Sequence, residues 1–178
     1  MTIVEVSRLL DRHGIPHAVI GAVALAVHGV LRASDDIDVL VTDRRCLDAP
    51  TWDGLAAAGV TVDAHRGDAA DPLAGVVRLT PPSGTRIDIV VGRSRWQADI
   101  LARAQRVALM GAPLPVALPV DLVLLKLYAG GPQDARDVDQ LLDAVPNLES
   151  EVASALAVLP RECAALWHRI LTDRPPRH

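Results

Sequence analysis

Cysteines are scarce in this chain of 178 residues. The two that occur, Cys46 and Cys163, lie far apart and belong to no Cys-x-x-Cys or Cys-His cluster. Their number and spacing argue against a zinc site and against a disulfide framework. We therefore expect a protein of a reducing compartment, with the cytoplasm as the simplest choice.

An excess of positive charge and long apolar runs are also missing. The formal net charge of −4 argues against a dedicated electrostatic binder of nucleic acid, which normally has a strongly basic face. No apolar run is long enough to cross a bilayer, and the first residues lack the cationic segment and apolar block of a secretion signal. The sequence thus predicts a cytoplasmic location and no membrane partner.

Apolar residues, in contrast, make up half of the chain. This amount is enough for one compact domain, or for a core with a small helical extension. The pattern mixes strands and helices up to about residue 118 and is helical from there onward. We predict an α/β core over 1–118, a helical extension packed on that core over 119–173, and a disordered tail over 174–178.

The periodicity of apolar residues also predicts the individual elements. Three prolines, Pro113, Pro115 and Pro119, indicate a connector between the core and the helical part. The expected strands cover 17–20, 36–41, 60–64, a hairpin of 76–79 with 86–91, and a weaker strand at 107–110. The expected helices are one capped by Thr2 and stopped by Gly14, followed by 22–28, 52–58, 96–104, 121–129, 132–144, 148–159 and 161–171.

Two aspartates stand one residue apart at the start of the strand 36–41. Side chains alternate between the two faces of a strand, so Asp36 and Asp38 point to the same side. Partly buried carboxylates this close stay ionised beside a cation, and an all-oxygen site suits Mg²⁺. The alternative is a pair of solvated turn residues. Asp137 and Asp139 have the same spacing on a predicted helix, where they face different directions and cannot share a metal.

A third carboxylate, Asp88, lies within the apolar strand 86–91. If this strand neighbours the first one in register, Asp88 completes an acidic cluster as a metal ligand or as the base for an attacking hydroxyl. The alternative is an ion pair with Arg86, which lies two residues away on the same face.

Smaller signals flank these acids. Gly21 and Ala22 stand between a strand and a helix, where small residues let backbone N–H groups approach a phosphate. Arg32 and Ser34 precede the paired aspartates and have the groups to hold phosphate oxygens, or else to cap the chain locally. The helical region holds Lys126, which is the only lysine of the sequence.

Lys126 lies in a helix that is apolar nearly all round. Its ammonium is a natural partner for a triphosphate, although a lysine that snorkels to the surface is the simpler alternative. Asp134 and Asp137 follow three residues apart on one face of the next helix. Asp134 also has the position of a residue that complements the helix dipole.

Together these residues resemble the nucleotidyltransferase superfold shared by DNA polymerase β, CCA-adding enzymes and aminoglycoside nucleotidyltransferases. That family has a Gly-Gly or Gly-Ser turn, an Asp-x-Asp strand and a third Asp on a later strand, matched here by Gly21, Asp36, Asp38 and Asp88. The chain is more similar to the AbiEii-type branch of toxin nucleotidyltransferases, which has an Arg-x-Thr/Ser-x-Asp-Ile/Leu-Asp segment, a later Lys and an Asp-x-x-Asp pair. The matching residues are Arg32, Ser34, Asp36, Asp38, Lys126, Asp134 and Asp137.

The resemblance implies an α/β (α+β) fold with a small mixed β-sheet core, flanked by helices and followed by C-terminal helices. It also implies a Mg²⁺- or Mn²⁺-dependent transfer of a nucleoside monophosphate from an NTP to a hydroxyl of RNA, protein or a small molecule. In that reaction Asp36, Asp38 and Asp88 would hold the metal, Lys126 would grip the triphosphate, and Asp134 with Asp137 would orient Lys126 or the acceptor.

Two positions depart from the family pattern. Ala22 stands where a second Gly or Ser is usual, and Gly131 stands where an Arg often precedes the acidic pair. The resemblance implies a toxin with a cognate antitoxin. The alternative is a non-catalytic nucleotidyltransferase-like module that acts as the antitoxin or binding partner.

Overall fold

The computed structural model describes residues 1–174, which form two compact units. The first unit consists of Met1–Val23 with Ala33–Ala117, and the second consists of Ala24–Arg32 with 118–174. The helix α2 (Gly21–Val27) begins in the first unit and continues into the second. Among the described residues, no helix combines the length and apolar character needed to cross a bilayer.

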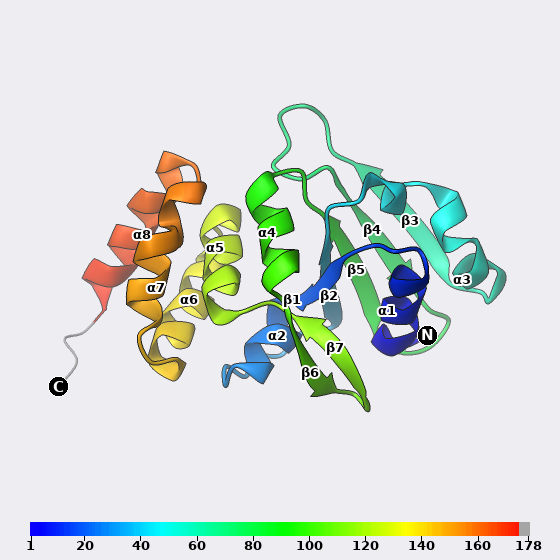
Figure 1. The fold of residues 1–178 in the computed structure, drawn as a ribbon, viewed down its shortest axis with the longest axis horizontal. Helices are drawn as coiled ribbons and strands as arrows, with labels where there is room; N and C mark the ends of the chain where they lie inside the picture. The colour runs from blue at the N-terminus through cyan, green and yellow to red at the C-terminus, as the bar shows by residue number, and fades with distance from the viewer. Residues whose placement is uncertain (175–178) are drawn as a thin grey trace. The chain divides into compact units, whose positions relative to one another are not determined.

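One mixed sheet of seven strands organises the first unit, in the order β3-β4-β5-β2-β1-β7-β6 (Figure 1). The central strands β2 and β5 run parallel, and β1 lies antiparallel to β2. The strands are β1 (His17–Ile20), β2 (Asp36–Val41), β3 (Thr61–Arg66), β4 (Gly75–Thr80), β5 (Arg86–Val91), β6 (Gln105–Leu109) and β7 (Ala112–Val116). The accompanying helices are α1 (Ile3–Arg12), α3 (Asp53–Ala57) and α4 (Arg95–Arg103), with 3-10 turns at Arg44–Leu47 and Ala49–Trp52.

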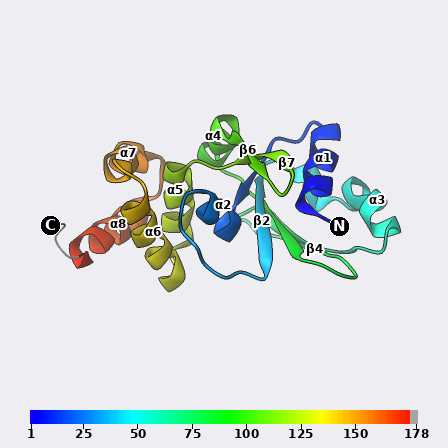
Figure 2. The ribbon, with the colours of Figure 1, turned by 90° about the horizontal axis from the view of Figure 1, so that it is seen from below.

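The two faces of the central strands differ in burial. Alternate residues such as Ile37 and Ile87 are buried, whereas their neighbours are partly exposed. Helices α1 and α4 lie on one side of the sheet, and each presents buried apolar residues, among them Leu10 and Ile100 (Figure 2). Because strand side chains alternate, the charged residues of β2 and β5 lie on the opposite face.

The second unit is helical after residue 118. It contains α5 (Pro119–Ala129), α6 (Pro132–Ala144), α7 (Leu148–Ala155), a 3-10 turn (Leu156–Val158) and α8 (Arg161–Asp173). Gly130 ends α5 in a left-handed conformation with φ of 72°, which glycine adopts without steric cost. Arg174 forms ion pairs with Asp139 and Asp143, and the other residues of the predicted tail, 175–178, lie outside the described residues.

The structure confirms the predicted fold class, a mixed α/β core with helices following it. The predicted connector at Pro113 and Pro115 was wrong, because these residues lie in strand β7. The backbone N–H of Ala117 donates to the carbonyl oxygen of Val19 in β1. Because backbone N–H groups alternate in direction along a strand, the backbone nitrogens of both prolines also point toward β1. There β7 pairs with β1 at a single register position, so the missing N–H groups of the prolines remove little pairing.

Candidate functional site

Three carboxylates gather on the partly exposed face of the sheet, and we call Asp36, Asp38 and Asp88 the acidic triad. Parallel pairing of β2 with β5 sets Asp38 directly beside Asp88 and sets Asp36 beside Arg86. The side chain of Asp36 is 25% exposed and that of Asp88 is 13% exposed. Strand alternation within β2 and register between β2 and β5 therefore bring the three predicted acids together.

Gly21 lies against the triad at the point where β1 ends and α2 begins. Its φ is +63°, and a Cβ added there would collide with the Asp38 carboxylate. Asp38 is also the register partner of Ile20, the last residue of β1. Only glycine therefore combines this backbone conformation with so close an approach of a carboxylate. The next residue, Ala22, is buried and supplies no hydroxyl.

Two arginines face the triad. Arg86 forms an ion pair with Asp36 and lies with its Nε 3.3 Å from Asp88 Oδ1. Arg78 of β4 is the antiparallel partner of Asp88 and places its Nε 3.4 Å from the same oxygen. The pKa of Arg86 is raised above its ordinary value, first by its hydrogen bond to Asp36 and next by the charge of Asp88. The alternative of an Arg86–Asp88 ion pair is thus what the structure contains.

The oxygen donors of the triad are the type that Mg²⁺ and Mn²⁺ take. Within residues 1–174, however, no group of three or more His, Cys, Asp and Glu side chains is arranged to hold a metal ion. Two of the triad carboxylates point to guanidinium groups instead. The oxygen donors of the triad therefore suit a hard cation. In the structure, the arginines provide the positive charge that such a cation would supply.

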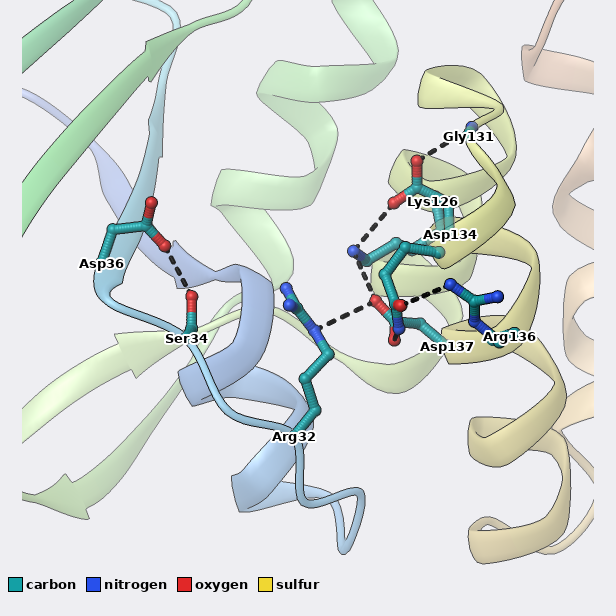
Figure 3. A network of polar contacts seen from close by, with 9 residues as sticks. Arg32, Ser34, Asp36, Lys126, Gly131, Asp134, Arg136 and Asp137 are labelled. Atoms are coloured by element: carbon teal, nitrogen blue, oxygen red, sulfur yellow. Dashed lines mark hydrogen bonds and ion pairs between the residues drawn. The ribbon is translucent and has the colours of Figure 1, made fainter.

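The residues before β2 have different partners from one another. Ser34 donates its hydroxyl to Asp36 Oδ1 at 2.6 Å (Figure 3). Arg32 belongs to the second unit, where its Nε lies 3.4 Å from Asp137 Oδ2. In the structure Ser34 therefore supports a triad carboxylate, and Arg32 supports the charged residues of the helical unit.

Lys126 and the Asp-x-x-Asp pair form a second polar cluster, which lies in the helical unit (Figure 3). The Lys126 ammonium lies 2.9 Å from Asp134 Oδ1 and 2.7 Å from Asp137 Oδ2. Asp137 is fully buried and also accepts a hydrogen bond from the Gln133 amide at 2.8 Å. Because the Lys126 side chain is 13% exposed and doubly paired, the alternative of a snorkelling surface lysine was wrong.

Asp134 has a second role at the start of α6. Its Oδ2 accepts a hydrogen bond from the backbone N–H of Gly131 at 3.0 Å, which satisfies one of the donors left open at a helix N-terminus. Arg136, four residues after Pro132 in α6, donates to the side chain of Gln133 at 2.9 Å. Asp134 thus caps α6 with one carboxylate oxygen and contacts Lys126 with the other.

Sequence reasoning missed Arg78 and Gln133. The hairpin of β4 and β5 carries the signal for Arg78, because a turn centred on Ser83 sets residues 78 and 88 opposite one another. Gln133 lies four residues before Asp137 on a predicted helix, the spacing at which side chains meet. Both residues were therefore within reach of pattern arguments once the hairpin register and the helix were accepted.

Several solved structures share this arrangement of strands and helices. An antigenic nucleotidyltransferase-like protein from Paracoccidioides brasiliensis has a TM-score of 0.57 and 18% identity, over 96% of this chain and 86% of that one. The lincosamide adenylyltransferase LnuA bound to lincomycin has a TM-score of 0.52 and 12% identity, over 80% of this chain and 96% of that one. ANT(2″)-Ia in complex with adenylyl-2″-tobramycin has a TM-score of 0.52 and 16% identity, over 94% and 95%.

These likenesses show that the chain has a nucleotidyltransferase-like fold, as its motifs predict. No protein-family model matches the chain, and no curated protein matches its sequence. The assignment to the AbiEii branch stays a prediction.

Proposed function

We propose that the protein is a nucleotidyltransferase that moves a nucleoside monophosphate from an NTP to an acceptor hydroxyl and releases pyrophosphate. The observation that carries the proposal is the acidic triad, with Asp38 in register beside Asp88 and pressed against Gly21. The nucleotidyltransferase-like fold supports it. A likeness in fold does not by itself fix an activity, so the proposal depends on the triad.

In this proposal the triad holds Mg²⁺ or Mn²⁺. When bound, such a cation would neutralise charge on the triphosphate and lower the pKa of the attacking hydroxyl. Asp88, whose side chain is 13% exposed, is the group within the chain that accepts the proton of that hydroxyl or completes the ligand set. Gly21 lets the backbone at the start of α2 approach a phosphate closely, and Lys126, oriented by Asp134 and Asp137, binds the triphosphate.

The finer proposal is a toxin of the AbiEii type that acts on an RNA 3′ end. It rests on the Arg-x-Ser-x-Asp-Ile-Asp segment at 32–38 and on Lys126 with its Asp-x-x-Asp pair. A cognate antitoxin and a cytoplasmic location belong to the same proposal. The structures with bound lincomycin and adenylyl-2″-tobramycin give reason to include small-molecule hydroxyls among the acceptors.

A second candidate function is a non-catalytic nucleotidyltransferase-like module that serves as a binding partner. One observation favours it: Arg86 pairs with two of the three triad carboxylates, which satisfies their charge without a metal. Ala22, which lacks a hydroxyl at the phosphate turn, points the same way.

The deciding experiment measures NTP binding and pyrophosphate release with each of the four NTPs and Mg²⁺ or Mn²⁺, with RNA and small-molecule acceptors. The test variant is Asp38→Asn, and the matched control is Asp63→Asn, an exposed carboxylate on β3. Loss of a residue behind a metal ligand costs about 10- to 100-fold, so loss of a ligand itself should cost about 100-fold or more. Asp63→Asn should leave the rate unchanged.

Equal pyrophosphate release by wild type and Asp38→Asn would defeat the enzymatic proposal, as would absence of NTP binding. The second result would favour the binding module.

A further inference from the structure

Arg86 forms ion pairs with two of the three carboxylates of the acidic triad. It lies on β5 two residues before Asp88 and is the cross-strand partner of Asp36, so one guanidinium reaches both carboxylates. The negative charge of Asp38 acts on the same guanidinium, after the larger effects of Asp36 and Asp88. Arg86 is therefore the positive charge at the centre of the triad.

The guanidinium of Arg86 is a cation that the protein cannot remove by deprotonation, because arginine stays charged at all accessible pH values. It can be removed by movement, since the side chain is long and 36% exposed. A divalent cation on the same carboxylates would stand next to this fixed charge and be repelled by it. Binding of the cation and pairing of Arg86 therefore compete.

Arg78 provides an internal comparison. It contacts only one triad carboxylate, Asp88, at 3.4 Å, and its side chain is 45% exposed. An exposed single pair contributes little, whereas Arg86 joins two carboxylates across neighbouring strands. The two arginines thus carry the same charged group but contact different numbers of triad carboxylates.

We propose that Arg86 is a positioning residue that sets the affinity of the triad for its divalent cation, and that it leaves Asp36 and Asp88 when the cation binds. The inference rests on the proposed function in one respect only, that a divalent cation is the ligand of the triad.

The test measures Mn²⁺ binding by the full chain without NTP, using the paramagnetic resonance of free Mn²⁺ and titration calorimetry. Arg86→Gln should bind Mn²⁺ about tenfold more tightly than wild type, and Arg78→Gln should differ by about twofold or less. Asp38→Asn should abolish Mn²⁺ binding both in the wild-type protein and in combination with Arg86→Gln. Arg86→Lys, which keeps the charge but lacks the planar fork, should lie between wild type and Arg86→Gln.

Thermal unfolding supplies a second readout, and it also covers a poorly folding variant. Without metal, Arg86→Gln should melt below wild type because the triad carboxylates lose their counter-charge. Saturating Mn²⁺ should raise the melting temperature of Arg86→Gln more than that of wild type. If Arg86→Gln does not fold, Arg86→Lys decides by the same two measurements.

Unchanged or weaker Mn²⁺ binding by the Arg86 variants would overturn the inference. The same conclusion would follow if Mn²⁺ raised the melting temperature of wild type and of the Arg86 variants equally. That result is distinct from failure of the proposed function. Tighter Mn²⁺ binding by Arg86→Gln without any NTP turnover would support the inference about Arg86 and reject the proposed enzymatic function. NTP turnover with unchanged Mn²⁺ affinity would support the enzymatic function and reject the inference.

Discussion

Gly21 shows how a single residue shapes the triad, and Gly14 provides a matched control. Both have a positive φ, +63° and +64°, but a Cβ at Gly14 would meet nothing within 4 Å. Alanine at either position should cost about 1–2 kcal/mol through backbone strain. Gly21→Ala should lose further stability, and it alone should lose pyrophosphate release, because the new methyl group displaces the Asp38 carboxylate.

Urea unfolding of both variants, together with the pyrophosphate assay, checks this prediction. Equal stability losses with equal activities would show that the approach of Asp38 to Gly21 has no consequence.

Single residues of the triad were predictable because strand alternation depends only on local sequence. The alternation places Asp36 and Asp38 on one face, and the apolar neighbours of Asp88 mark its facing. The collision distance at Gly21 was not predictable, because it depends on the register of β1 against β2. The same is true of the second contact of Arg86, which needs β2 and β5 to be neighbours.

At the scale of elements, the charged cluster of α5 and α6 should stabilise the helical unit. Asp137→Asn removes a buried charge that faces Lys126 and Arg32, so it should lower the free energy of unfolding by about 2 kcal/mol or more. Asp139→Asn is the control on the same helix, since Asp139 is 48% exposed and pairs with Arg174. That exposed pair should contribute about 1 kcal/mol or less.

Urea unfolding followed by circular dichroism measures both variants. A loss for Asp139→Asn as large as that for Asp137→Asn would mean that burial of the pair adds nothing to its strength.

Helices were the easiest elements to predict, and the proline-bearing strand was the hardest. Helix α6 begins and ends at the predicted residues, Pro132 and Ala144, because proline suits the first turn and the apolar spacing is regular. Strand β7 was missed because prolines normally exclude a strand. Its pairing is possible only through the sheet order, which places β6 on one side and a short contact with β1 on the other.

For the whole molecule, the order of elements predicted a mixed core followed by helices, but not the strand order β3-β4-β5-β2-β1-β7-β6. That order depends on long-range pairing, which no local pattern encodes. Nor does the sequence signal that residues 24–32 group with the C-terminal helices. These two facts decide which charged residues share a unit, and hence why Ser34 and Arg32 have separate partners.

The two cysteines report on the two units separately, since Cys46 lies in the first unit and Cys163 in the second. Burial raises the pKa of the Cys46 thiol to about 12, and burial also raises the pKa of Cys163. Because the thiolate is the reactive form, Cys46 should resist alkylation at pH 8 by about a hundredfold or more relative to the unfolded chain, and Cys163 should also react more slowly than in the unfolded chain.

Peptide mass spectrometry of the wild-type protein, alkylated at increasing urea concentrations, measures each thiol without a substitution. Cys163 should be labelled at the lower urea concentration, because it lies in the first turn of α8 and is 7% exposed, whereas Cys46 is 0% exposed. Labelling of both thiols along one common curve would contradict this expectation, because it would mean that the two units unfold in a single cooperative step.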